Sequence, residues 1–171
     1  MMPDDHSQPK VQREDLPYRH GVGIALFNKD GKVLIARRFH AANSWQMPQG
    51  GRGHGETDLQ AAFRELYEEV GVPKDAVVLL EEMKETLTYD LPDKFVGKAW
   101  HGRFRGQEQR WFAMRLVAGD DVIRLDVHHH REFDEWRWED LHKLPDIITS
   151  FKRSLYEAVV AAFTQYATPQ T

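Results

Sequence analysis

The chain has 171 residues, 41% of them hydrophobic and 29% charged, with no cysteine and a net charge of −4. This length favours one domain, and the lack of cysteine excludes a disulfide scaffold, a cysteine-ligated metal site and a cysteine nucleophile. No apolar run reaches the roughly 18 residues that cross a bilayer, the N-terminal residues carry no apolar signal core, and the net charge disfavours a uniformly basic nucleic-acid binder. We therefore expect a cytoplasmic protein with no membrane partner.

The N-terminal part of the sequence predicts an arm, a β-hairpin and a loop. Residues 1–17 are polar and contain three prolines, which is typical of a flexible arm. Two β-rich runs, 21–28 and 32–38, flank an Asn-Lys-Asp-Gly turn, and we expect them to form a hairpin. Residues 41–56 are rich in glycine and show no regular period, so we expect a loop there.

The clearest helix in the sequence begins near Thr57, a capping residue. Gly71 stands at the usual C-terminal glycine position, and Pro73 prevents continuation. The apolar residues between these ends recur at i, i+4, i+7 and i+11, which places them on one stripe. They are Leu59, Phe63, Leu66 and Val70.

The C-terminal part predicts one or two strands over 76–91, strands over 109–119 and 135–140, and a last helix over about 146–163. Residues 18–165 then form a single domain, and residues 166–171 form a frayed tail. The elements do not alternate regularly, so we expect an α+β fold, with an α/β/α sandwich on a mixed β-sheet. Four tryptophans are assigned to the core: Trp45, Trp111, Trp136 and Trp138.

Three carboxylates cluster on a second face of the predicted helix, because Glu65, Glu68 and Glu69 are spaced at i, i+3 and i+4. Like charges at this spacing repel, and carboxylates in the last turn oppose the helix dipole. A hard divalent cation with oxygen ligands resolves the conflict. The alternative is a solvated acidic face in which Arg64 pairs with Glu68.

The context of this helix supports the metal interpretation. Nine constrained residues within a span of 23 fit the pattern G-x5-E-x7-R-E-U-x-E-E-x-G-U, in which U is aliphatic. They are Gly50, Glu56, Arg64, Glu65, Leu66, Glu68, Glu69, Gly71 and Val72. The sequence resembles the Nudix hydrolases in this pattern. The resemblance implies an α/β/α sandwich with a loop–helix–loop metal site. It also implies cleavage of a nucleoside diphosphate linked to another group, by attack of water on phosphorus.

Further segments narrow the resemblance to one branch of the family. The segments WQMPQGG, KETLTYDLP, GQEQRWF, EFDEWRW and SFKR are similar to those of bacterial RNA pyrophosphohydrolases and of asymmetric dinucleoside polyphosphate hydrolases. The similarity extends from Tyr18 to Phe163. A tyrosine at the position of Tyr89 is typical of the dinucleoside polyphosphate branch.

The resemblance assigns roles to individual residues. Glu65, Glu68 and Glu69 match glutamates that bind Mg²⁺ or Mn²⁺, and the backbone carbonyl of Gly50 matches a further ligand. The position of Arg64 matches an arginine that orients these glutamates.

A distant acid, Glu132, matches a residue that acts as a ligand or as a proton acceptor in this branch. The general base therefore remains open among Glu65, Glu69 and Glu132. The histidines at 128–130 point alternately along an extended segment and are interpreted as a solvated loop.

Several residues are candidates for substrate contact. Arg19 and Arg38 carry guanidinium groups that can bind phosphate oxygens or stack on a base. By resemblance, Tyr89 lies at the substrate mouth, and Phe151 and Lys152 contact the 5′ end, with Phe151 stacking. Phe151 also falls on the apolar face of the last helix, where core packing is the alternative.

The leading hypothesis is a metal-dependent RNA 5′-pyrophosphohydrolase that leaves a 5′-monophosphate and thereby promotes RNA decay. A dinucleoside polyphosphate hydrolase is the alternative, and a non-catalytic nucleotide-binding or RNA-binding module is the weaker alternative. Residues 94–115 carry six basic side chains and one acid. If these converge on the acidic helix with Arg38 and Lys152, they form a groove along an RNA backbone.

Overall fold

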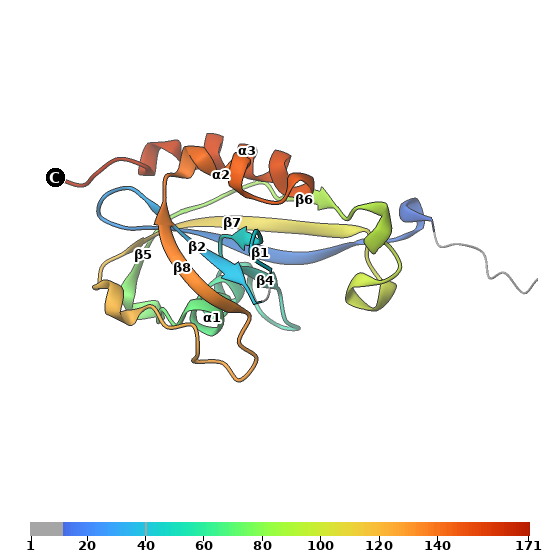
Figure 1. The fold of residues 1–171 in the computed structure, drawn as a ribbon, viewed down its shortest axis with the longest axis horizontal. Helices are drawn as coiled ribbons and strands as arrows, with labels where there is room; N and C mark the ends of the chain where they lie inside the picture. The colour runs from blue at the N-terminus through green and yellow to red at the C-terminus, as the bar shows by residue number, and fades with distance from the viewer. Residues whose placement is uncertain (1–11, 40) are drawn as a thin grey trace, which may run out of the picture.

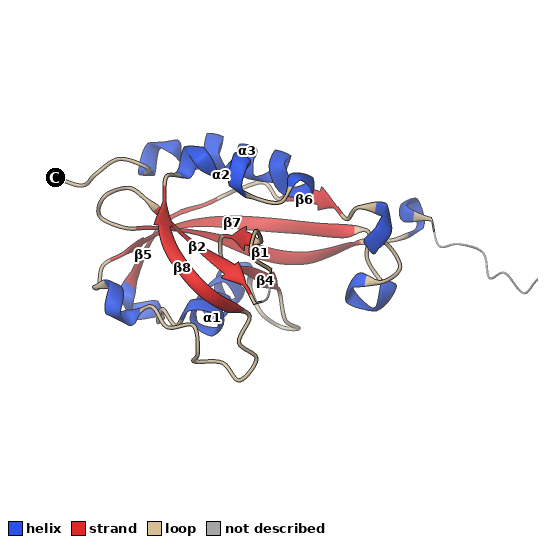
Figure 2. Cartoon of the chain, viewed as in Figure 1, coloured by secondary structure: helices blue, strands red, loops and turns tan. Residues whose placement is uncertain are grey.

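The computed structural model describes residues 12–39 and 41–171 and arranges them as one mixed β-sheet with helices on both faces (Figure 1, Figure 2). The predicted α/β/α sandwich is thus confirmed. The strands are β1 (Tyr18–Phe27), β2 (Val33–Arg38), β3 (Trp45–Gln46), β4 (Gln49–Gly51), β5 (Val77–Glu82), β6 (Leu87–Asp90), β7 (Gly106–Leu116) and β8 (Phe133–Glu139). The α-helices are α1 (Asp58–Val70), α2 (Leu144–Ile147) and α3 (Arg153–Phe163).

Short 3₁₀ turns connect several of these elements. Those in the described residues are Arg13–Asp15, Lys74–Ala76, Asp93–Phe95, Ala99–Gly102, Asp120–Val122, Leu141–Lys143, Ser150–Lys152 and Thr164–Tyr166. No helix within 12–39 and 41–171 has the length and apolar character needed to cross a membrane.

The centre of the sheet is the parallel pair β1 and β7, which are in register along the whole of β1. The order through the sheet is β3-β2-β1-β7-β5, while β4, β6 and β8 pair with β1, β7 and β2. Alternate residues of β1 serve two cores, since successive side chains of a strand point to opposite faces. Ile24 and Leu26 pack in the core beneath α1, whereas Ala25 and Phe27 pack in the core beneath α3. The strands β1 and β7 thus contribute side chains to both cores.

The helix α1 follows the sequence prediction closely. Thr57 caps it through a capping box with Gln60, and Gly71 ends it in the left-handed conformation at φ 75°. Leu66 and Val70 are fully buried, and the other two residues of the predicted stripe pack partly buried against the same core. The apolar stripe fixes which side of α1 faces the sheet, and it leaves the acidic face turned toward the β4 loop.

Two predicted elements differ in the structure. The glycine-rich segment predicted as a loop contains the short strands β3 and β4, which exist only through pairing with β2 and β1. The predicted last helix is interrupted at Ile148, which is extended at φ −78° and ψ 151°. The β-branched residues 147–149 disfavour helix. The interruption places residues 150–152 at the rim of the site.

The described residues near the two ends of the chain form hydrogen bonds with the domain. Residues 1–11 of the predicted arm lie outside the described residues. The remainder of the arm is held by Arg13, which donates hydrogen bonds to Leu91 and Asp93. The predicted frayed tail is attached to the sheet: the Tyr166 hydroxyl donates to Glu81, and the Gln170 amide donates to the carbonyl of Lys29.

The tryptophan prediction is only partly correct. Trp111 is fully buried, as expected. The other three, Trp45, Trp136 and Trp138, are partly buried at the margins of the cores. Each lies on β3 or β8, toward one side of the sheet, where a large ring covers apolar neighbours without being enclosed.

Removing the cap of α1 should lower the stability of the protein. Thr57→Ala eliminates the side-chain oxygen that accepts from the Gln60 amide, and we expect a loss of about 1 kcal/mol. At this chain length that corresponds to a thermal midpoint lower by roughly 2–4 °C, measured by calorimetry. Thr57→Ser retains the acceptor and serves as the control. Equal midpoints for the alanine and serine variants would contradict the capping role.

Candidate functional site

The Arg64 side chain connects the acidic helix to the glycine-rich loop. Its guanidinium donates to both carboxylate oxygens of Glu56, at 2.7 and 2.9 Å, and to the carbonyl of Gly51 at 2.8 Å. It also donates to Glu65 at 2.8 Å and to Glu68 at 3.2 Å. The hydrogen bonds that Arg64 donates to Glu56, and then the one that it donates to Glu65, raise the pKa of Arg64 despite its partial burial. The predicted Arg64–Glu68 pair is therefore present as one part of a larger network.

The carboxyl groups of Glu65 and Glu69 form a buried pair on α1. Burial raises the pKa of both, and the charges of Glu132 and Glu65 raise the pKa of Glu69 further. The Gln49 amide donates to Glu69 at 3.2 Å, and this hydrogen bond partly offsets the rise in the pKa of Glu69. Gly50 has no room for a side chain, because a Cβ there would overlap the Glu65 carboxylate. The predicted Gly50 position thus lies directly against a predicted ligand.

A divalent cation fits this carboxylate set. The Oε2 atom of Glu69 is buried and has no hydrogen-bond partner in the structure, and an unsatisfied buried carboxylate oxygen is costly. The site is not preassembled: within 12–39 and 41–171, no three side chains of the ligand types converge at metal-binding distance. Glu65 and Glu68 are instead turned toward Arg64. The oxygen-only donors are those that Mg²⁺ and Mn²⁺ prefer.

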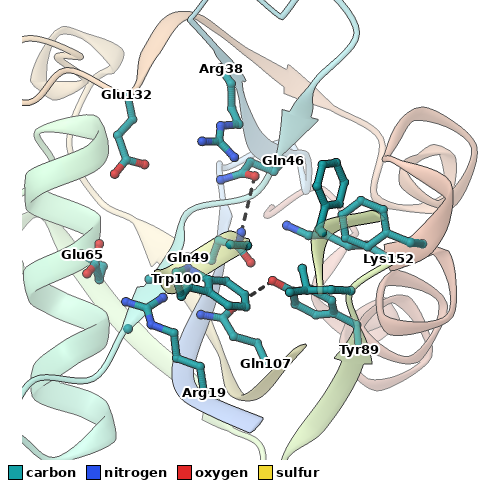
Figure 3. A pocket seen from close by; sticks show the side chains of 16 residues that line it. Arg19, Arg38, Gln46, Gln49, Glu65, Tyr89, Trp100, Gln107, Glu132 and Lys152 are labelled. Atoms are coloured by element: carbon teal, nitrogen blue, oxygen red, sulfur yellow. Dashed lines mark hydrogen bonds between the residues drawn. The ribbon is translucent and has the colours of Figure 1, made fainter. Parts of the chain in front are cut away.

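Glu132 reaches the site from the segment before β8. The Phe39 amide donates to the Glu132 carbonyl at 2.9 Å, and the pairing of β2 with β8 shifts register between Arg37 and Arg38. Such a bulge redirects the strand next to it. Glu132 and Arg38 consequently line the same cavity as Glu65 (Figure 3). The structure thus brings the distant acid of the sequence prediction to the acidic helix.

Every predicted substrate residue lines this cavity, which has a volume of about 490 Å³. Arg19 comes from β1, Arg38 from β2, Tyr89 from β6, and Phe151 with Lys152 from the turn before α3. Among the described residues, Arg19, Arg38 and Lys152 form no ion pair, in contrast to Arg64 and most other arginines. Three unpaired cations thus face the acidic helix across one cavity (Figure 3).

Lys152 and Tyr89 form one wall of the cavity. The Lys152 ammonium lies 5.0 Å from the centre of the Tyr89 ring. Burial, and then repulsion from Arg38, lowers the pKa of Lys152 to about 8. Burial raises the pKa of Tyr89 to about 12, because the charged form of tyrosine is the deprotonated one. Phe151 contacts Tyr89 at a ring distance of 5.9 Å and packs partly against the core. Both sequence alternatives for Phe151, core packing and cavity lining, therefore hold together.

A chain of glutamines forms the floor of the cavity and was missed by the sequence analysis. Gln109 donates to Gln49 at 2.7 Å, Gln49 donates to Gln46 at 3.4 Å, and the Tyr89 hydroxyl donates to Gln107 at 3.2 Å. A signal was present, since Gln107 and Gln109 share the inward face of a strand with Trp111. Polar residues at core positions of a strand indicate a buried network.

The six basic residues of 94–115 do not form the predicted groove. Arg105 pairs with Asp90, and Arg110 pairs with Asp58 at the start of α1, away from the glutamates. Arg115 lies at the other end of β7, where it donates to the carbonyl of Asn28. None of the six lines the cavity of about 490 Å³. A strand distributes successive side chains to both faces and along its length, so proximity in sequence does not gather them.

The histidine run at 128–130 is a loop segment with its three rings close together. The ring centres of His128 and His129 are 4.4 Å apart, and those of His129 and His130 are 4.2 Å apart. Two of the three side chains are exposed. The three side chains therefore gather rather than alternate along the segment, while the exposure of His129 and His130 is that of a surface loop.

The family of the chain follows from fold, site and comparison together. Residues 17–159 match the family described as NUDIX domain. The chain therefore belongs to the NUDIX domain family and is a hydrolase of that family. Nudix hydrolases generally need divalent metal ions, which agrees with the buried carboxylate oxygen on α1.

Two relatives and two solved structures are similar to most of the chain. The chain is 47% identical over 163 residues to an RNA pyrophosphohydrolase of Rhodospirillum rubrum, covering 95% of this chain and 97% of the relative. It is 49% identical over 156 residues to an RNA pyrophosphohydrolase of Acidiphilium cryptum, covering 89% and 93%. Among solved structures, the E. coli dihydroneopterin triphosphate pyrophosphohydrolase superimposes with a TM-score of 0.65 at 20% identity, covering 85% and 99%.

A second solved structure, a C. elegans Ap4A hydrolase binary complex, superimposes with a TM-score of 0.63 at 22% identity, covering 86% of this chain and 98% of that one. At these identities, the two structural likenesses concern the fold alone.

Glu69→Gln should stabilise the metal-free protein at neutral pH. The pKa of Glu69 is raised in the folded state, so the folded chain binds a proton that the unfolded chain releases. The unfolding free energy of the wild type therefore falls as the pH rises through the interval between the two pKa values. Glutamine has no such proton to lose. We expect the thermal midpoint of the variant, relative to the wild type, to increase from about pH 5 to about pH 8 in EDTA.

Glu68→Gln is the matched control, because the Glu68 side chain is 33% exposed and lies on the same helix. It should show no comparable increase with pH. A Glu69→Gln variant that is less stable than the wild type at about pH 8 would contradict the interpretation of Glu69 as a buried acid with a raised pKa.

Proposed function

We propose that this chain removes pyrophosphate from the 5′ end of triphosphorylated RNA and leaves a 5′-monophosphate. The observation that carries the proposal is the set of unpaired cations, Arg19, Arg38 and Lys152, which face the acidic helix across one cavity. A polyphosphate with its metal ion complements both halves of such a site. The names of relatives at 47–49% identity support RNA as the carrier of that polyphosphate.

The reaction consumes one water molecule and breaks one anhydride bond. A water oxygen attacks phosphorus, the P–O bond to the departing pyrophosphate breaks, and the water proton passes to a carboxylate. Glu65 and Glu132 line the cavity, whereas Glu69 is 5% exposed and does not line it. We therefore propose that either Glu65 or Glu132 accepts the water proton.

Glu65, Glu68 and Glu69 would hold the divalent metal, with the Gly50 carbonyl and Glu132 completing its oxygen ligands. When bound, Mg²⁺ or Mn²⁺ neutralises phosphate charge and lowers the pKa of water. Arg64 orients Glu65 and Glu68 through its hydrogen bonds. Arg19, Arg38 and Lys152 hold the phosphate oxygens, and Phe151 and Tyr89 form an aromatic wall of the same cavity.

A dinucleoside polyphosphate is the second candidate substrate, and a specific feature of the cavity favours it. Aromatic rings from four elements line the cavity, namely Tyr89, Phe95, Trp100 and Phe151. Such rings can stack on a base at either end of a dinucleotide. A non-catalytic binding module is disfavoured, since the buried, unpartnered oxygen of Glu69 serves no purpose in nucleotide binding alone.

A substrate panel tests the proposal. Triphosphorylated RNA, diadenosine tetraphosphate, ADP-ribose and dGTP are each incubated with Mg²⁺, and products are separated by chromatography. We expect kcat/KM to be highest for the RNA, with pyrophosphate and 5′-monophosphorylated RNA as products. EDTA should abolish turnover, and Mg²⁺ or Mn²⁺ should restore it. A higher kcat/KM for diadenosine tetraphosphate would replace the first candidate by the second, and turnover that survives exhaustive chelation would refute the metal assignment.

The charge of Lys152 should make substrate binding sensitive to alkaline pH. Since the pKa of Lys152 is about 8, its protonated fraction falls about tenfold for each pH unit well above that value. We expect the KM for triphosphorylated RNA to rise between about pH 7.5 and about pH 9.5. Lys152→Arg keeps its charge throughout and should flatten this rise. An equal rise of KM in wild type and variant would contradict the role of Lys152 in phosphate binding.

A further inference from the structure

The segment that carries Trp100 has an unusual backbone. Trp100 at φ 50° and His101 at φ 59° are the only non-glycine residues with positive φ among those the structure describes. Bulky side chains rarely adopt this left-handed region, because the Cβ approaches the carbonyl oxygen that follows it. Such conformations persist where the surroundings impose them, and they concentrate at functional sites.

Two glycines close this segment on itself. Gly97 and Gly102 have positive φ at 83° and 73°, and a Cβ on Gly102 would meet the carbonyl oxygen of Gly97. The Trp100 ring also packs edge-on against Phe104 at a ring distance of 6.2 Å. The tight closure presents the Trp100 ring at the cavity, whereas His101 is exposed and does not line it.

The Trp100 ring meets one of the three unpaired cations. The guanidinium carbon of Arg19 lies 5.3 Å from the centre of the ring, within the range of a cation–π contact (Figure 3). The guanidinium also lies against Gly51, where a Cβ would overlap it. Arg19 therefore contacts both an aromatic ring and the backbone of the glycine-rich loop. The carbonyl of that same Gly51 accepts a hydrogen bond from Arg64.

We propose that Trp100 is a positioning residue that holds the Arg19 guanidinium in place for the phosphates of the substrate. A long arginine side chain without an ion pair has many rotamers, and holding it in one lowers the entropic cost of binding phosphate. The ring restrains the guanidinium and leaves its positive charge available. A carboxylate in the same place would neutralise that charge. The strained backbone at Trp100 is thereby explained, since it directs the ring at Arg19. The role rests on the proposed function only in that Arg19 contacts phosphate.

A double-mutant cycle tests the role. Trp100→Gly should lower kcat/KM about tenfold on the substrate that the wild type prefers, while Trp100→Phe should restore most of the loss. Arg19→Gln should lower kcat/KM at least as much. The double variant should be no worse than Arg19→Gln alone, because the ring acts through the guanidinium.

His101→Gly is the matched control, since it relieves the same left-handed strain without removing a ring from the cavity. It should keep kcat/KM within about twofold of the wild type and raise the thermal midpoint. Trp100→Leu repeats the test if the glycine variant does not fold. Independent, multiplying losses in the double variant, wild-type activity of both Trp100→Gly and Trp100→Leu, or an equal loss in His101→Gly would each overturn the proposal.

Different measurements test the proposed function and the proposed role of Trp100. Turnover of the wild type is measured first, so inactivity on triphosphorylated RNA counts against the proposed function alone. The cycle is then run on diadenosine tetraphosphate, and its outcome still decides whether Trp100 positions Arg19.

Discussion

The Arg64 guanidinium is the contact on which the rest of the site depends. Three glutamates in the last two turns of α1 repel one another, and no basic residue lies in the last turn to offset the helix dipole. Arg64 compensates two of them directly and ties the helix to the loop through Glu56 and the Gly51 carbonyl. The loop in turn presents Gly50 to Glu65 and Gly51 to Arg19. A single side chain thus joins the acidic helix to the glycine-rich loop that borders the cavity.

Ion pairing, rather than position in the sequence, separates the basic residues that stabilise the fold from those that line the cavity. Arg105 and Arg110 are neutralised by Asp90 and Asp58 and contribute to structure. Arg19, Arg38 and Lys152 line one cavity and lack such partners among the described residues, and the buried Oε2 atom of Glu69 on the neighbouring acidic helix also lacks one. Unsatisfied groups of both signs in and beside one cavity destabilise the protein without its ligands, and in the proposed function a polyphosphate with its metal ion would satisfy both. Local conflicts of this kind are expected at functional sites.

The accuracy of the sequence predictions follows the range of the interactions involved. The helix α1 was correctly predicted from Thr57 to Gly71, because capping and the spacing of its apolar residues act within a few turns. Strands β3 and β4 were missed because two or three residues carry no period and pair only with distant strands. The break at Ile148 was also missed. The apolar spacing of this segment continues the helical pattern and conceals the weaker signal of the β-branched residues 147–149.

The sequence by itself determined the carboxylate helix: its ends, its buried stripe, and the grouping of Glu65, Glu68 and Glu69 on one face. These are local consequences of a period of 3.6 residues. Only the tertiary structure decided which cations meet that helix. Arg19, Arg38 and Lys152 lie on separate elements, while the dense basic run at 94–115 contributes none. Trp100 joins the cavity for the same reason, since strand pairing and loop closure bring together residues that no local pattern relates.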